Sequence, residues 1–270
     1  MTPLRLGIVT DVHFGPEARH EGRLRKLSAH AEPLLREFVE RMNDVDRPDL
    51  VVNLGDVVED ESPALDRERY ARFTELLGAA TAELVHVAGN HDQMHLADGE
   101  LTALMGLPDG PPWRSFDRGD WHFVVLCTRY VPGRSVHLPP DQIAWLEEDL
   151  ARTRLDTLVL VHHPLCEMDC RGNRWFERQP HLCRVAERRQ VRRVLEESGK
   201  VRAVFSGHAH WNHLSVIGGI PYVTLQSLIE NLDEDAPGRP ARAHAFVELT
   251  RGGLRCEIRG EEPCRYRFSW

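Results

Sequence analysis

The stretch "LRLGIVTDVH" (residues 4–13) contains a pattern that recurs along the chain. A short run of Leu, Ile and Val is typical of a buried strand, and it leads directly into Asp11 and His13. The same order, an apolar run followed at once by ligand-type side chains, returns four more times. These stretches are "DLVVNLGD" (residues 49–56), "ELVHVAGNHD" (83–92), "DTLVLVHHP" (156–164) and "VRAVFSGHAH" (201–210). The sequence therefore predicts a set of buried strands that all end in polar residues.

Helices are expected between these strands. Apolar residues recur at helical spacing across residues 23–42, where Pro33 interrupts the helix or marks a second start. Further helices are expected over residues 68–80, 139–152 and 182–197, and a further strand over residues 122–128. Strands that alternate with helices predict parallel βαβ units, and the β-rich part 211–270 predicts antiparallel partners. We expect an α/β fold in a single domain, residues 1–270.

Composition is that of a globular protein. Hydrophobic residues make up 41% of the 270 residues and charged residues 28%, and no apolar run approaches the roughly 18 residues of a membrane span. The N-terminus lacks the features of a signal peptide and the six cysteines are scattered, so we expect a cytoplasmic protein. The formal net charge of −8 argues against a nucleic-acid groove. A small molecule is therefore the expected partner, and a homo-oligomer stays open.

The strand ends indicate a metal site. The carboxyl ends of parallel strands share one edge of a sheet, where ligands bind. Imidazole nitrogen suits zinc and iron, whereas carboxylate oxygen suits manganese and magnesium. The mixed set exceeds the capacity of one tetrahedral ion, but two ions that share a bridging carboxylate would use all of it. Such a pair, about 3.5–4 Å apart, clamps the attacking and leaving oxygens of a displacement at phosphorus. Gly55, Gly89 and Gly207 are expected to let the backbone turn sharply.

Taken in order, the five strand ends resemble the motifs of the calcineurin-like metallophosphoesterase superfamily. The matching residues are Asp11-x-His13, Gly55-Asp56, Gly89-Asn90-His91-Asp92, His162-x-Pro164 and Gly207-His208-x-His210. They run from residue 11 to residue 210 and so cover most of the chain. The resemblance implies a four-layer αββα sandwich, a dimetal site at the C-terminal ends of the strands, and a hydrolase that cleaves phosphoester bonds.

The resemblance also implies a role for each motif residue. One ion would be bound by Asp11, His13 and His210, the other by Asn90, His162 and His208, and Asp56 would bridge them. His91 would be the catalytic histidine that assists the leaving group, with Asp92 orienting it and raising its pKa. The attacking group would be a metal-bridging hydroxide. The ions would be a divalent or mixed-valence pair of manganese, iron or zinc, among which the ligand types do not choose.

The motif details narrow the class of phosphoesterase. The stretch "GDVVEDE" lacks the arginine that the superfamily's protein serine/threonine phosphatases carry there, and His91 stands where lipid A precursor hydrolases carry arginine. The short "GNHD" and "HHP" forms look most like the bacterial class III cyclic-nucleotide and glycerophosphodiester phosphodiesterases. We therefore expect a phosphodiesterase acting on a cyclic nucleotide, a glycerophosphodiester or a similar molecule.

Other functions stay open beside this one. A broad-specificity phosphomonoesterase or a hydrolase of nucleoside-diphosphate compounds would use the same residues. A catalytically silent scaffold that binds proteins would have no reason to keep His91 and the full set of ligands, and here every motif position is filled. A metallo-β-lactamase-like hydrolase would need an H-x-H-x-D-H motif, which the sequence lacks.

The segment 164–180 predicts a lid, because it is long, patternless and begins directly after the expected ligand His162. Arg174 and Trp175 are its candidate substrate contacts, since guanidinium binds phosphate well and an indole can stack on a base. Packing of Trp175 and Phe176 onto the sheet edge is a nearly equal alternative.

Two other groups of residues near this segment have ordinary explanations. Cys166, Cys170, His181 and Cys183 invite a structural zinc site, but their spacing does not match common zinc patterns, so we expect reduced cysteines that pack the segment. His163 is expected to lie behind the ligand His162, because neighbouring side chains on a strand point to opposite faces.

Overall fold

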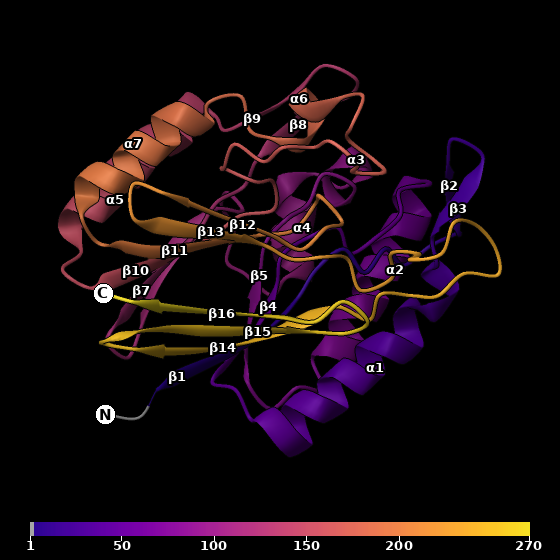
Figure 1. Ribbon diagram of the computed structural model, residues 1–270, viewed down its shortest axis with the longest axis horizontal. Coiled ribbons are helices and arrows are strands. Elements are labelled where there is room, and N and C mark those ends of the chain that lie inside the picture. Colours follow the sequence, from indigo (N-terminus) through magenta and orange to yellow (C-terminus); the bar gives the residue numbers. More distant parts are fainter. Residues whose placement is uncertain (1–2) are drawn as a thin grey trace.

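The computed structural model describes residues 3–270, which form two six-stranded sheets packed face to face with helices outside each sheet (Figure 1). The order of the first sheet is β16-β15-β14-β1-β4-β5, and that of the second is β12-β13-β11-β10-β7-β6. The first contains β1 (Leu4–Val9), β4 (Leu50–Asn53), β5 (Glu83–His86), β14 (His244–Thr250), β15 (Gly253–Arg259) and β16 (Cys264–Ser269). The second contains β6 (Arg114–Arg118), β7 (Trp121–Val125), β10 (Asp156–Leu160), β11 (Val201–Ser206), β12 (His213–Ile217) and β13 (Ile220–Thr224).

Helices cover the outer face of each sheet. The first sheet packs against α1 (Ala31–Arg41) and α2 (Pro63–Leu77), and the second against α5 (Pro140–Arg152) and α7 (Arg188–Ser198). The remaining elements are short: η1 (Ser28–His30), η2 (Met42–Asp46), α3 (Asp92–His95), α4 (Asp98–Leu104), α6 (Pro180–Cys183), and the hairpins β2 (Ala18–His20)–β3 (Arg23–Lys26) and β8 (Arg129–Val131)–β9 (Ser135–His137). The four-layer αββα sandwich is thereby confirmed. No helix among residues 3–270 has both the length and the apolar character to cross a bilayer.

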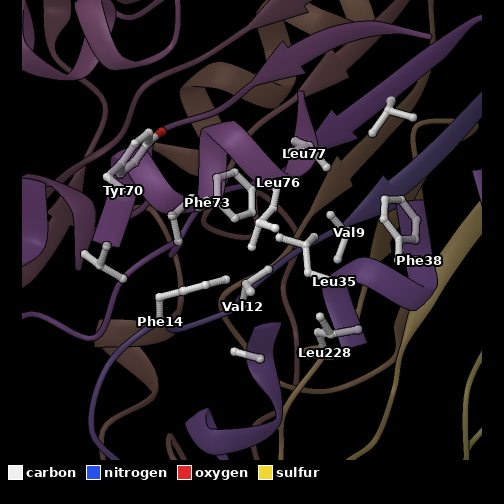
Figure 2. Close-up of a cluster of buried hydrophobic side chains, with 14 of the residues drawn as sticks. Val9, Val12, Phe14, Leu35, Phe38, Tyr70, Phe73, Leu76, Leu77 and Leu228 are labelled. Carbon is white, nitrogen blue, oxygen red and sulfur yellow. The ribbon is translucent and has the colours of Figure 1, made fainter. Parts of the chain in front are cut away.

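Three apolar clusters fill the three interfaces between these layers. Successive side chains of a strand point to opposite faces, so Leu6 and Ile8 of β1 pack between the sheets while Val9 packs toward α1. Figure 2 shows this outer cluster, in which Val9 lies near Leu35 of α1. Because the central strands are buried on both faces, they read as continuous apolar runs in the sequence.

The predicted mixture of parallel and antiparallel pairing is confirmed. β1, β4 and β5 pair in parallel, as do β7, β10, β11 and β13. The β-rich part of the chain adds antiparallel partners to both sheets, because β14 pairs with β1 and β12 pairs with β13. In Figure 1 both termini lie at the left, whereas the β2–β3 hairpin lies at the opposite side of the molecule.

The helix expected over residues 23–42 begins later than predicted, so the predicted start is wrong. The chain there forms the β2–β3 hairpin, and α1 begins only at Ala31. Glu21 and Gly22 have φ values of 50° and 79°, and this left-handed pair closes the hairpin turn. Pro33 lies in the first turn of α1, where a missing N–H costs nothing, so it marks a helix start.

Other boundaries differ because local signals were missed. The helix expected over residues 182–197 begins only at Arg188, after the short α6. α2 begins at Pro63, five residues earlier than expected, because the hydroxyl of Ser62 accepts a hydrogen bond from the backbone nitrogen of Leu65 and caps the helix. The edge strands β6 and β16 were not predicted, since charged residues interrupt their apolar pattern.

Glycines let the polar strand ends approach one another closely. Gly55 has a φ of 102°, as a sharp turn requires, but Gly89 and Gly207 do not have positive φ. Instead, a Cβ on Gly89 would overlap the backbone nitrogen and carboxylate of Asp56, and a Cβ on Gly207 would overlap the side chains of Thr10 and Asp11. The turning role expected for these two glycines is therefore wrong: they permit contact between neighbouring loops.

Gly89→Ala is expected to lower the free energy of unfolding by about 1–3 kcal/mol, because the added methyl group must displace backbone atoms of Asp56. Gly99→Ala, near the start of α4, is the matched control, since a Cβ there meets nothing within 4 Å. Denaturant titrations of both variants after treatment with a chelator measure the difference. Equal stability of the two variants would contradict the close approach of the loops.

Candidate dimetal centre

The structure gathers the seven expected metal ligands at the carboxyl ends of the strands. All seven are buried, with at most 7% of each residue exposed: Asp11, His13, Asp56, Asn90, His162, His208 and His210. Ligand atoms of Asp11, His13 and His210 lie within 4.8 Å of one another, as do those of Asp11, Asp56 and His162. Side chains from both sheets therefore meet in one buried polar cluster.

Five of these seven residues have left-handed backbone conformations. Their φ values are 52° for Asp11, 48° for His13, 52° for Asp56, 66° for His208 and 49° for His210. Such φ values are uncommon outside glycine and cost about 1–3 kcal/mol each, and they persist where the surrounding structure imposes them. Here hydrogen bonds between the loops do so: the backbone nitrogen of Asp11 donates to the carbonyl of Gly55 (2.9 Å) and that of His13 to the carbonyl of Asp56 (3.1 Å). The strained backbone turns these side chains into the shared cluster.

Each of the four expected histidine ligands has one ring nitrogen close to an oxygen of the protein, through a hydrogen bond in three of them and an ion-pair contact in His13, and this leaves the other nitrogen available. Partners of this kind fix the tautomer and orientation of metal-binding histidines. The four pairs are His162 Nδ1 with the carbonyl of Leu54 (2.8 Å), His208 Nε2 with the carbonyl of Leu182 (3.1 Å), His210 Nδ1 with Glu230 Oε2 (2.7 Å), and His13 Nδ1 with Glu59 Oε2 (3.0 Å).

The remaining donor atoms fit metal ions. His13 Nε2 lies 3.1 Å from His210 Nε2, and His210 Nε2 lies 3.4 Å from Asp11 Oδ1. Two ligands that each lie about 2.0–2.2 Å from one ion are separated by about this distance. Asn90 Oδ1 and His162 Nε2 are buried without a hydrogen-bond partner among residues 3–270, although buried polar atoms are normally paired. A pair of cations would satisfy both groups of atoms.

The electrostatics of the cluster also favour cations. Burial alone would lower the pKa of His162, but the charge of Asp56 raises it to about 9. Burial likewise opposes protonation of His210, but its contacts with Asp11 and Glu230 raise its pKa to about 9. Burial lowers the pKa of His208 to about 3, so this imidazole is neutral and offers a lone pair. Positive charge is therefore drawn to the two positions next to the carboxylates.

His91 is the accessible member of the cluster. Its side chain is 23% exposed, whereas those of His13 and His162 are fully buried. Its Nδ1 forms a short contact with Asp60 Oδ1, and its Nε2 lies 3.2 Å from Lys26 Nζ. His91 is thus held by a carboxylate on one side, while its other nitrogen lies beside the ammonium of Lys26.

Asp92, which we expected to orient His91, has other partners. Its carboxylate is fully buried and accepts hydrogen bonds from the backbone nitrogens of Asp56 (3.0 Å), Val57 (2.8 Å) and Gly89 (2.8 Å). It therefore ties the loop after β4 to the loop after β5. The orienting carboxylate that the structure provides is Asp60, which corrects the expectation.

Four charged residues at the site lie outside the motifs and were not predicted: Lys26, Glu59, Asp60 and Glu230. Glu59 and Asp60 form an acidic pair three and four positions after Asp56, and this closeness in sequence was the one available signal. Glu230 follows β13 in an apolar stretch without a motif. Its position became clear only from the fold, in which it contacts both His210 and Trp175.

The structure gives Arg174 a role in holding a loop. Its guanidinium donates to the carbonyls of Asn231 (2.6 Å) and Leu232 (3.1 Å) and lies 3.4 Å from Glu234 Oε1. These bonds fasten the segment 164–180 to the loop that follows β13. The guanidinium is thus engaged by protein atoms on one side, and its contact with substrate stays a prediction.

Two aromatic residues of the same segment lie against the metal cluster. The ring of Trp175 is 5.3 Å from that of His210, and its Nε1 donates to Glu230 Oε2 at 3.0 Å. The ring of Phe176 is 4.7 Å from that of His208. The segment therefore packs against two expected ligands, both from the loop after β11 of the second sheet.

The other residues singled out by sequence have clear places. His163 is fully buried, with Nδ1 2.6 Å from Thr128 Oγ1, and its ring lies 4.0 Å from that of His208. One of its ring nitrogens groups with those of His162 and His208 within 4.8 Å, closer to the cluster than we expected. Three free cysteines pack in the apolar cluster under α5 and α7: Cys166, Cys170 and Cys183.

Comparison with known proteins agrees with this geometry. The family model described as calcineurin-like phosphoesterase matches residues 4–212. A "Probable cyclic nucleotide phosphodiesterase" of Synechococcus sp. is 33% identical over 233 residues, which are 83% of this chain and 77% of that protein. A "cAMP/cGMP dual specificity phosphodiesterase" of Mycobacterium tuberculosis is 28% identical over 79% of this chain and 64% of its own length.

A solved structure shows the same fold over the whole chain. The dimetal phosphatase from Danio rerio superposes with a TM-score of 0.75 over 99% of both chains, at 18% identity. At that identity the likeness shows the fold alone. The family-model match, however, covers the motif-bearing strands from β1 to the loop after β11. The chain therefore belongs to the calcineurin-like phosphoesterase family.

Proposed function

We propose that this protein hydrolyses small-molecule phosphodiesters with the help of two metal ions, and that cyclic nucleotides are the first substrates to test. The observation that carries the proposal is the buried cluster of seven donor residues, with His91 as its accessible member. The two bacterial relatives named as cyclic nucleotide phosphodiesterases support a diester substrate.

The donor atoms divide naturally between two ions. Asp11, His13 and His210 would bind one ion and Asn90, His162 and His208 the other, with the carboxylate of Asp56 between them. A bound pair of manganese, iron or zinc ions supplies positive charge for the phosphoryl oxygens and lowers the pKa of water. Glu59 and Glu230 support this arrangement by holding His13 and His210 through their second nitrogens.

His91 is the group that we propose for leaving-group assistance. Its Nδ1–H donates to Asp60, so Nε2 is the nitrogen that faces the substrate. In hydrolysis the oxygen of a water molecule bonds to phosphorus as the phosphorus–oxygen bond to the leaving group breaks, and the leaving oxygen takes the proton carried on Nε2. Asp60 would keep the imidazole in this orientation. Trp175, which lies beside His210, would contact the organic part of the substrate.

A kinetic panel with manganese-loaded enzyme tests the proposed reaction. The kcat/KM for bis(p-nitrophenyl) phosphate is expected to exceed that for p-nitrophenyl phosphate by at least about tenfold, and cyclic nucleotides are expected to be hydrolysed. Trp175→Ala should change kcat/KM unevenly across the panel, because contacts to the non-reacting part of a substrate are used in the transition state. Hydrolysis of the monoester alone would contradict the proposal.

Substitutions at Asp56 and His91 separate metal binding from leaving-group assistance. Asp56→Asn is expected to lose both bound metal and activity, because it removes the charge between the two ions. His91→Ala is expected to keep the metal and to lose turnover by about 10²–10⁴-fold. Elemental analysis and initial rates on the same samples make the comparison. Loss of metal from His91→Ala, with activity proportional to the metal that remains, would show that His91 is a ligand instead.

Substitutions at two neighbouring aspartates distinguish an orienting role from a structural one. Asp60→Asn is expected to lower kcat while the melting temperature stays within 1–2 °C, roughly the effect of a surface change. Asp92→Asn is expected to lower the melting temperature clearly, because buried backbone donors lose a charged acceptor. Thermal denaturation and initial rates measure both. If Asp92→Asn instead mainly lowered kcat and left the stability unchanged, Asp92 would be the residue that orients His91, as the sequence predicts.

A further inference from the structure

Lys26 is an unusual residue for this chain. Lys26 and Lys200 are the two lysines of the sequence, which has 34 basic residues in all. Most exposed ion pairs among residues 3–270 are made by arginine, whereas Lys26 is 3% exposed and lies at the end of β3, inside the site. A compact ammonium group differs from guanidinium because it is a point charge with three donors.

The surroundings of the Lys26 ammonium place it beside the proposed reacting atoms. Nζ lies 2.6 Å from Glu59 Oε2 and 3.2 Å from His91 Nε2, and it stands over the ring of Trp175, 5.2 Å from the centroid. The backbone of Lys26 also bridges to that of Glu230. The β2–β3 hairpin therefore carries a cation to the nitrogen of His91 that faces the substrate.

A purely structural ion pair with Glu59 does not account for this position. Glu59 Oε2 already lies 3.0 Å from His13 Nδ1, so its carboxylate has a second partner. Burying an ammonium group costs several kcal/mol unless it is well paired. An ammonium group that only neutralised Glu59 would not need to contact His91 Nε2. A group that takes part in the reaction would need that contact.

We propose that Lys26 is a catalytic residue that donates a hydrogen bond to the leaving oxygen of the substrate, the same oxygen that His91 protonates. Because Nζ and His91 Nε2 are 3.2 Å apart, one oxygen can lie within hydrogen-bond reach of both nitrogens. This inference rests on the proposed phosphodiesterase function.

The physical effect is stabilisation of charge that develops during the reaction. As the phosphorus–oxygen bond breaks, the leaving oxygen becomes more negative, and a fixed ammonium group stabilises it more strongly than it stabilises the substrate. The proton comes from His91, and Lys26 keeps its own protons throughout. The contribution of Lys26 should therefore grow as the leaving group becomes a poorer one, because more charge then has to be stabilised.

A series of aryl methyl phosphodiesters with phenols of increasing pKa provides the kinetic test. For manganese-loaded Lys26→Met, kcat/KM is expected to fall about 10²-fold with the poorest leaving group and much less with p-nitrophenolate. Lys200→Met is the matched control. Lys200 directly precedes β11, at the end of the strands opposite the site, and its ammonium donates to the carbonyl of Leu150. The kcat/KM of this variant should depend on the leaving-group pKa as that of the wild-type enzyme does.

The outcomes separate this inference from the proposed function. If the wild-type enzyme hydrolyses none of the diesters, the proposed function fails. If the wild-type enzyme hydrolyses them but Lys26→Met lowers every rate by one common factor, or loses bound metal, then Lys26 is structural and the inference is overturned.

A second measurement uses the wild-type protein and does not depend on turnover. With isotopically labelled lysine, nuclear magnetic resonance of the zinc-loaded protein should show two sets of side-chain signals, one for each lysine. Inorganic phosphate is expected to shift the signals of Lys26 and to leave those of Lys200 unchanged, and Lys26→Arg assigns them. Binding of phosphate, seen in its own ³¹P signal, without a shift at Lys26 would overturn the inference.

Discussion

Several carboxylates are buried at one edge of two apolar sheets, and the surrounding loops are built to neutralise their charge. Asp11 and Asp56 are at most 1% exposed, and Glu59 lies beside them with a side chain that is 15% exposed. Buried charges are costly unless they are paired and hydrogen-bonded. The loops offset this cost with imidazoles, the ammonium of Lys26 and backbone donors. Bound metal cations would stabilise the buried carboxylates further. Two bound cations would in turn attract the negative phosphoryl group of a substrate.

The sandwich makes this concentration of charge feasible. Its three apolar interfaces hold the strands rigidly, so their ends can support left-handed backbone conformations at Asp11, Asp56 and His208. Asp92 joins the loops after β4 and β5 through their backbone nitrogens, and Gly89 allows them to touch. The stable core thus supports the local strain that directs the donor groups toward one another.

Much of the fold could be predicted, because strands buried on both faces consist of consecutive apolar residues. Much of the cluster could be predicted as well, because each of these strands is followed by its polar motif. The misplaced helix start at residues 23–42 had a different cause: the apolar spacing of a hairpin imitated a helix, and the turn at Glu21 and Gly22 was overlooked. Lys26 and Glu230 could not be found from the sequence pattern alone. Their roles depend on tertiary contacts between segments that are far apart in the chain, such as the bridge between Lys26 and Glu230.

Two ions that share Asp56 are expected at the strand ends. A crystal structure of the manganese-loaded protein, with anomalous scattering recorded at the manganese edge, would locate them. Two anomalous peaks are expected about 3.5–4 Å apart, both within bonding distance of the Asp56 carboxylate. One peak alone, or two peaks of which neither lies next to Asp56, would contradict this expectation.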